Sequence, residues 1–187
     1  MDALLPPRPG ELLISTSATG AGIFDRSVVV LLDVEAGALG VIINMASEVP
    51  VIEVLPEWHR IVNAPAVLFA GGPVSPNGAI CVAKLMNPAV EPPGFHSSFG
   101  DIGLVHLDTP VELVDGAFSD LRVFAGYAGW DVGQLEAELL AGMWVRGRAS
   151  DADIFGVDQS SLWRRLMSRH GSEHAVLANW TATPELN

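Results

Sequence analysis

Residues 122–144, with the sequence RVFAGYAGWDVGQLEAELLAGMW, constrain the fold more than any other part of this chain. An apolar run leads into a turn of aromatic and glycine residues, and an amphipathic stretch follows. Asp131 is suited to cap a helix, Gln134 is suited to complete a capping box, and Gly142 stands where a helix often ends. The segment therefore predicts a strand, a tight turn and a helix over 132–141.

The predicted helix has one apolar face, and a second helix of the same kind is expected near the C-terminus. Val132, Leu135 and Leu139 follow helical spacing and are expected to be buried. The second helix is predicted over 160–169 and is expected to stop at Gly171. Its buried stripe is expected to contain Leu162, Trp163, Leu166 and Met167.

Short apolar runs rich in β-branched residues recur along the chain and predict strands. Several are apolar at consecutive positions, which is typical of a sheet buried on both faces. The runs 28–32 and 39–43 are expected to form an antiparallel hairpin. Residues 87–100, with three prolines, predict a loop, and 110–118 has a weak helical pattern. The predicted strands cover residues 12–14, 28–32, 41–43, 66–70, 79–83, 104–107 and 123–127.

The composition excludes several classes of protein. Hydrophobic residues at 49% and charged residues at 17% indicate a globular protein, and 187 residues suit a single domain, 1–187. The formal net charge of -12 repels polyanions, so we predict no nucleic-acid partner. The one basic cluster complements the dipole at the end of a predicted helix. It contains Arg164, Arg165, Arg169 and His170.

The sequence also predicts a cytoplasmic location. Cys81 is the only cysteine, so no disulfide forms within the chain. The first ten residues contain prolines in place of the apolar core of a signal peptide. The longest apolar run has five residues, against about 18 for a membrane span, so no membrane partner is expected.

Motifs that carry chemistry are scarce. The chain has none of the local signatures for dinucleotides, nucleoside triphosphates, zinc proteases, hydrolase elbows or redox dithiols. His170 and His174 have helical spacing, but Gly171 interrupts that helix, so we predict no metal and no cofactor. Gly71 and Gly72 follow a strand and favour a tight turn over an anion-binding nest.

Tyr127 and Trp130 flank small residues just before the helix predicted over 132–141. Their rings could line a ligand cleft, with Arg122 or the helix N–H groups binding an anion. Core packing is the commoner role for such rings and is the alternative interpretation.

Four further blocks of sequence accompany the 122–144 segment: GELLIS at 10–15, FDRSVVVLL at 24–32, GVIIN at 40–44 and GGPV at 71–74. In this order, and over nearly the whole chain, the blocks resemble the AlgH/YqgE family of bacterial proteins. The resemblance implies an α+β domain with a bifurcated, mostly antiparallel sheet curled into a pseudo-barrel and a few flanking helices. It implies no activity, because the family is uncharacterised and its regulator label comes from an association with alginate control.

The polar residues of these motifs are the candidate site, because packing alone does not explain them. We predict a non-enzymatic domain that binds a small ligand or a protein partner through a cleft near Asn44 and the 127–134 turn. Asn44, Gln134 and Glu138 are expected to converge on one pocket. The alternative is a hydrolase acting on a small anionic substrate with Glu138 or Asp25 as general base, and a DNA-binding regulator ranks third. The candidate ligand-binding residues are Asn44, Arg122, Tyr127, Trp130, Gln134 and Glu138.

Overall fold

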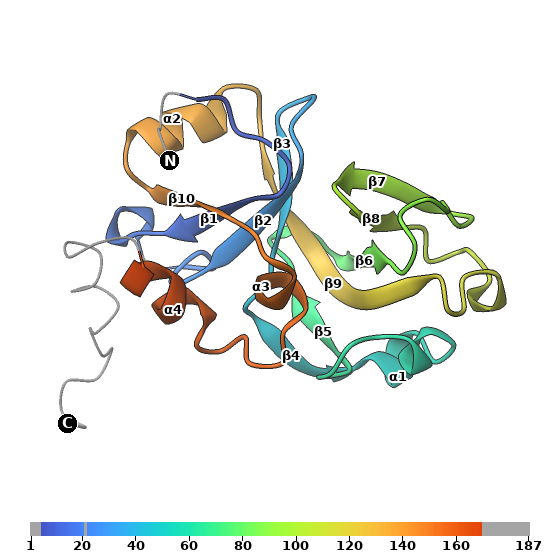
Figure 1. Cartoon of the computed structure of the whole chain (residues 1–187). Coiled ribbons are helices and arrows are strands. Elements are labelled where there is room, and N and C mark those ends of the chain that lie inside the picture. The colour runs from blue at the N-terminus through green and yellow to red at the C-terminus, as the bar shows by residue number, and fades with distance from the viewer. Residues whose placement is uncertain (1–4, 21, 170–187) are drawn as a thin grey trace.

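The computed structural model describes residues 5–20 and 22–169 of the chain (Figure 1). Ten strands in these residues form one branched sheet that curls into a half-barrel, with short helices around it. Each run of residues predicted to form a strand overlaps one of them. The strands are β1 (Glu11–Ser15), β2 (Val28–Asp33), β3 (Ala38–Ile42), β4 (Ala46–Pro50), β5 (Val67–Ala70), β6 (Val74–Leu85), β7 (Phe95–Phe99), β8 (Ile102–Val105), β9 (Phe118–Trp130) and β10 (Trp144–Arg148).

The sheet branches at β9, which pairs with β3 near its C-terminal end, with β5 in its middle and with β6 over residues 118–127. The β5–β9 pair is parallel and the other pairs are antiparallel, including the predicted β2–β3 hairpin. The main path through the sheet is β10-β1-β2-β3-β9-β6-β8-β7. The α+β fold expected from the family resemblance is therefore confirmed.

The α-helices of the described residues are short, and within this part of the chain no helix is long and apolar enough to cross a bilayer. The cytoplasmic location stays a prediction. The helix expected over 160–169 is confirmed, and its four apolar stripe residues are buried. Gly171, His170 and His174 lie outside the described residues. The helices are α1 (Val51–Val54), α2 (Gln134–Leu140), α3 (Asp151–Phe155) and α4 (Leu162–Arg169).

Strands β1 to β3 are buried on both faces, as their consecutive apolar residues predict. Val28 and Val30 belong to a core cluster that also contains residues of α3 and α4. Val29 and Leu31, which point to the opposite face, pack in a second cluster with α2 and Trp130. The sheet therefore separates α4 from α2, and side chains on these two helices act on different faces of the protein.

Gly71 and Gly72 connect β5 to β6 and lie directly against β9. A Cβ atom on Gly71 would be 2.3 Å from the carbonyl oxygen of Gly126, and one on Gly72 would be 2.2 Å from the carbonyl carbon of Tyr127. Only glycine permits this approach. The Gly71 N–H donates to the Ala125 carbonyl oxygen of β9 at 2.8 Å, so this N–H group is already used in a hydrogen bond within the sheet. This geometry agrees with the tight turn favoured by the sequence.

Helix α2 begins two residues later than the sequence predicts. Gly133 occupies the N-cap position with a φ of 82°, so the prediction that Asp131 caps the helix is wrong. The Gln134 side chain does reach back, accepting a hydrogen bond from the Asp131 N–H at 3.1 Å. Val132 lies in the turn before the helix, and its side chain is 83% exposed where helical spacing had predicted burial.

The rest of α2 follows the sequence-based prediction. Leu135 and Leu139 are buried against the sheet. Gly142 has a φ of 71° and its N–H donates to the Leu139 carbonyl, while the Met143 N–H donates to the Glu138 carbonyl. This pair of bonds is the Schellman pattern, which satisfies the last carbonyls of a helix.

Two further predictions of secondary structure are wrong. The expected loop over 87–100 contains β7, because all three of its prolines precede Phe95 and the remaining residues pair with β8 as an edge strand. The weak helical pattern over 110–118 forms a single 3₁₀ turn over Val111–Leu113. Gly116 then adopts a φ of 75° and the chain enters β9.

Candidate functional site

Asn44 follows β3 and fixes the turn that precedes β2. Its Oδ1 accepts a hydrogen bond from the Val28 N–H at 2.8 Å, and its Nδ2 donates to the Arg26 carbonyl at 2.9 Å. Arg26 has a φ of 51°, which is uncommon for a residue other than glycine. The Asn44 amide therefore holds the Arg26 backbone in a conformation that the turn alone would not favour.

Asn44 and Arg26 line a pocket of about 230 Å³, here called the Asn44 pocket. The start of α4 forms another wall of this pocket. The Arg26 guanidinium lies over the Trp163 ring, with 5.6 Å between its Cζ and the ring centroid. Trp163 is itself held by its Nε1, which donates to the Ser15 carbonyl at 2.9 Å. The lining residues are Arg26, Asn44, Ser160, Ser161, Trp163 and Arg164.

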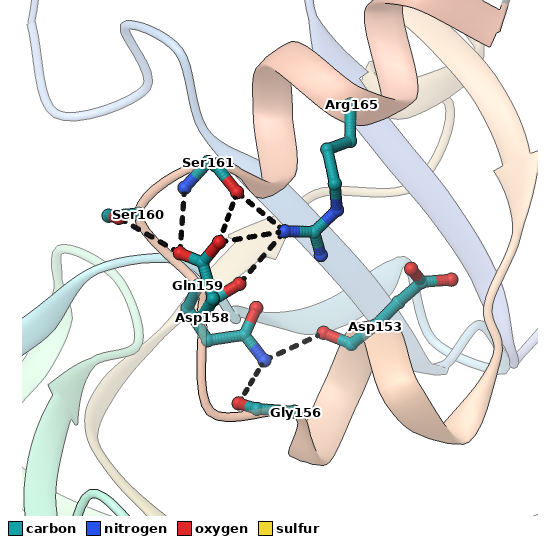
Figure 2. Close-up of polar contacts among 7 residues, drawn as sticks. All are labelled: Asp153, Gly156, Asp158, Gln159, Ser160, Ser161 and Arg165. Atoms are coloured by element: carbon teal, nitrogen blue, oxygen red, sulfur yellow. Dashed lines mark hydrogen bonds and ion pairs between the residues drawn. The ribbon is translucent and has the colours of Figure 1, made fainter.

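Figure 2 shows how Asp158 holds the start of α4. Its carboxylate accepts hydrogen bonds from the Ser161 hydroxyl at 2.6 Å and the Ser160 hydroxyl at 3.0 Å. These bonds from Ser161 and Ser160 keep the pKa of the Asp158 carboxyl below its usual range. Arg165 lies 3.4 Å from the same carboxylate, so the negative charge of Asp158 is balanced locally.

The loop between α3 and α4 is held by Gln159, which is also drawn in Figure 2. Its side chain is buried, and Nε2 donates to the carbonyls of Asp153 at 3.1 Å and Gly156 at 2.9 Å. Ser150 and Asp153 form a capping box at the start of α3. Together these bonds fix the loop that leads into α4, so the pocket wall is built before any ligand arrives.

Arg122 lies in the core with a relative exposure of 2%. It donates to carbonyls at the end of α3: Nη1 to Ile154 at 2.6 Å, and Nη2 to Phe155 at 3.1 Å and Gly156 at 3.0 Å. Burial lowers the pKa of Arg122 to about 10, so it is charged at neutral pH. The structure thus places Arg122 as a cap for α3, and not beside Trp130 as expected for a cleft residue.

Glu138 and Gln134 lie on α2 and do not meet Asn44. Oε2 of Glu138 accepts hydrogen bonds from Nε1 of Trp130 at 2.8 Å and Nε1 of Trp144 at 2.7 Å. Gln134 Nε2 donates to the other carboxylate oxygen at 2.9 Å. Trp130 pairs with the first residue of β3, whereas Asn44 follows its last. The expectation that these three polar side chains share one pocket is therefore wrong.

Tyr127 and Trp130 border a second pocket of about 560 Å³ beside the β2–β3 hairpin. The Tyr127 side chain is half-buried, while that of Trp130 is buried under α2. The two aromatic residues singled out in the sequence are thus close to a ligand-sized space, but it is separate from the Asn44 pocket.

Most of the Asn44 pocket was not predicted from the sequence. Two consecutive serines before an amphipathic stretch indicate a helix start, which attracts anions, and this signal at 160–161 could have been used. The sequence places Arg164 in a cluster of basic residues near the end of the predicted helix. Helix α4 packs beside the turn before β2 through contacts such as the hydrogen bond from Trp163 to Ser15. These two residues are 148 positions apart in the sequence, so no local pattern encodes the contact.

The branched half-barrel, with short helices around one curled sheet, defines an α+β domain. The chain belongs to the AlgH-like family, whose model matches residues 12–175. It is 41% identical over 182 residues to a UPF0301 protein of Streptomyces avermitilis, covering 95% of this chain and 94% of that relative. A UPF0301 protein of Thermobifida fusca is 42% identical over 188 residues, with the same shares covered.

Two solved structures share the fold. A crystal structure of a Corynebacterium diphtheriae protein superposes with a TM-score of 0.85 at 26% identity, covering 94% of each chain. The solution structure of AlgH from Pseudomonas aeruginosa superposes with a TM-score of 0.68 at 22% identity, covering 93% of this chain and 94% of AlgH. The family is uncharacterised, so these likenesses establish the fold and leave the ligand to be argued from the pockets.

Proposed function

We propose that this protein is a non-enzymatic binding domain that holds a small anion in the Asn44 pocket. The supporting observation is that two arginines, Arg26 and Arg164, line one small pocket together with the start of α4. Guanidinium groups and helix N-termini both favour carboxylate and phosphate groups. Because the chain carries a net charge of -12, this is a local positive site on an acidic protein.

The size of the pocket supports a small ligand. Its volume of about 230 Å³ is below the roughly 300–1,000 Å³ of pockets for drug-sized molecules. We therefore propose a phosphate group or a small carboxylate as the part of the ligand that enters. Trp163 supplies a flat wall beside the Arg26 guanidinium, which supports contact with a planar carboxylate or an adjoining carbon skeleton.

The pocket is also pre-organised. Arg26 is stacked on Trp163 and its backbone is held by Asn44, so little side-chain freedom is lost when an anion binds. The carboxylate of Asp158, which precedes α4, has its charge offset by Arg165 at 3.4 Å. An incoming anion meets two guanidinium groups on the pocket wall.

The contacts of Glu138 argue against the hydrolase alternative. Its carboxylate already accepts hydrogen bonds from two indole N–H groups and from the Gln134 amide. A general base needs to reach the proton that it removes, and these donors occupy the oxygens that would do so. Asp25, the other candidate base, is exposed in the turn before β2.

Isothermal titration calorimetry with inorganic phosphate and a panel of phosphomonoesters and dicarboxylates tests the anion site. We expect saturable binding of one anion per chain. In a variant combining Arg26→Gln and Arg164→Gln, affinity is expected to fall on the order of tenfold or more, because both charge-assisted bonds are lost.

A variant combining Arg148→Gln and Arg169→Gln is the matched control for this experiment. Arg148 is an exposed arginine on β10 and Arg169 is an exposed arginine in the last turn of α4, so this variant also removes two positive charges, away from the pocket. Its affinity is expected to stay within about twofold of the wild-type value. Equal losses in the control and in the variant of Arg26 and Arg164, or no saturable binding to the wild type, would contradict the proposal.

We also expect no sequence-specific binding to duplex DNA at physiological salt. Tight binding to DNA needs several phosphate contacts from Lys and Arg, and the net charge of -12 opposes them. Fluorescence anisotropy with a set of labelled duplexes of different sequence, each titrated separately at about 150 mM salt, is the measurement. Tight binding of one duplex and not the others would show that the arginines of α4 bind DNA instead of a small anion.

A further inference from the structure

The second pocket, here called the β9 groove, runs beside the C-terminal end of β9 and has a volume of about 560 Å³. In Figure 1 the β2–β3 hairpin rises on one side of this region and the β7–β8 pair on the other. Four apolar side chains at the groove are open to solvent, one of them exposed and three partly buried, and they form its apolar floor. They belong to Leu39, Val74, Leu104 and Tyr127.

The rim of the β9 groove is acidic. Asp33 and Glu35 come from the β2–β3 hairpin and Asp131 comes from the end of β9, and all three are exposed. Among the described residues that line the groove, none is Lys, Arg or His. An occupant that matches this surface carries positive charge beside apolar groups.

The main chain at the groove has an open edge. Residues 128–130 pair with β3 along one edge. On the other edge, pairing with β6 ends at Tyr127 opposite Val74, and Gly72 lies against Ala128, so that a Cβ atom on Gly72 would be 2.4 Å from the Ala128 nitrogen. No strand of the described residues pairs with residues 129–130 on this edge. Gly129 is exposed in this stretch and lines the groove. Unpaired N–H and C=O groups on a strand edge accept an added strand.

We propose that the β9 groove binds an extended, basic segment of a partner protein, which adds as a short strand beside residues 129–130. Main-chain hydrogen bonds to the β9 edge hold the segment, and its alternate side chains divide between two environments. Apolar side chains contact the floor at Val74, Leu104 and Tyr127. Lys or Arg side chains reach the carboxylates of Asp33 and Asp131 at the rim. A small polyamine would satisfy the carboxylates and leave the strand edge and the apolar floor unused.

Fluorescence anisotropy tests this proposal with labelled octapeptides in which Lys or Arg alternates with Val, Leu or Phe, at about 150 mM salt. We expect saturable binding to the full-length protein. A variant combining Asp33→Asn, Glu35→Gln and Asp131→Asn is expected to bind on the order of tenfold more weakly. Absence of saturable binding by every peptide of the set would overturn the proposal.

A matched control distinguishes binding in the β9 groove from non-specific attraction of a basic peptide to an acidic protein. Glu53→Gln, Glu57→Gln and Glu112→Gln together remove the same charge from exposed positions away from the groove. This variant is expected to bind within about twofold of the wild type. Equal weakening by both triple variants would overturn the proposal, because it would show that only the overall charge acts.

Peptides with methylated backbone nitrogens test whether the bound segment pairs with the edge of β9 as a strand. Peptides methylated at alternate backbone nitrogens keep their charge and side chains but lose the donors that pair with a strand edge. In the two registers of methylation, we expect binding to be lost in one and kept in the other. Equal binding of both methylated forms, or displacement of the labelled peptide by spermidine at similar concentration, would overturn the proposal.

Discussion

Replacing Arg122 with alanine is expected to lower the free energy of unfolding by about 3 to 5 kcal/mol. The guanidinium is buried and donates to the carbonyls of Ile154, Phe155 and Gly156, which have no helical partners beyond the end of α3. Alanine would leave the Phe155 carbonyl without its donor and would leave the carbonyls of Ile154 and Gly156 with Gln159 alone. It would also open a cavity beside Phe69. Equilibrium unfolding in urea gives the value directly.

Two further substitutions show whether the hydrogen bonds or the volume of Arg122 matter. Arg122→Met keeps most of the side-chain volume and removes every donor, so we expect it to recover only a minor part of the loss. Arg148→Ala, at an exposed arginine on β10, is expected to change stability by less than about 0.5 kcal/mol. A methionine variant as stable as the wild type would show that Arg122 acts by packing and not as the cap of α3.

Replacing Trp130 with alanine is expected to cost about 3 to 5 kcal/mol, because a large buried ring is removed from beneath α2. Its ring packs with Phe24 and Trp144, at centroid distances of 6.4 and 6.0 Å. Trp130→Phe keeps an aromatic ring but loses the N–H that donates to Glu138, so a smaller loss of about 1 to 2 kcal/mol is expected. Thermal and urea unfolding of both variants provide the ranking.

The exposed neighbour Asp131 is the control for this pair. If Asp131 capped the helix, Asp131→Ala would cost about 1 kcal/mol. Because Gly133 occupies the cap position, the expected cost is below about 0.5 kcal/mol. A loss for Asp131→Ala that equals the loss for Trp130→Ala would contradict the described packing of α2 and would make Trp130 a candidate ligand contact.

The parts of the fold that the sequence predicts well are those fixed by local periodicity. The hairpin of 28–32 with 39–43 and the stripe of α4 follow from the spacing of apolar residues, and both are confirmed. The start of α2 was misplaced because two local signals compete there. Asp131 is a good cap, but a left-handed Gly133 cannot belong to the helix and delays its start. Propensity alone does not decide between them.

The candidate site was harder to predict because it depends on contacts between distant segments. The sequence indicates Asn44 as a polar residue that packing does not explain, and the structure places it in the wall of a pocket, whereas no local pattern indicates its partner Arg26. Arg122 was placed at a cleft because its position in the 122–144 segment suggested it, while the carbonyls that it caps lie more than 30 residues further along the chain. Glu138 is a candidate site residue from its polarity alone, and no sequence pattern shows that the Trp144 side chain points toward it and donates to its carboxylate.

Binding of an anion in the Asn44 pocket is tested most directly by a nuclear magnetic resonance titration of the ¹⁵N-labelled protein with inorganic phosphate. We expect saturable shifts of the Asn44 side-chain amide and the Trp163 indole N–H, which belong to the residues that line the pocket. The indole N–H groups of Trp130 and Trp144 donate to Glu138 on another face of the sheet, and their chemical shifts are expected to stay unchanged. Saturable shifts confined to Trp130 and Trp144, or no saturable shift at Asn44 and Trp163, would contradict the proposed site.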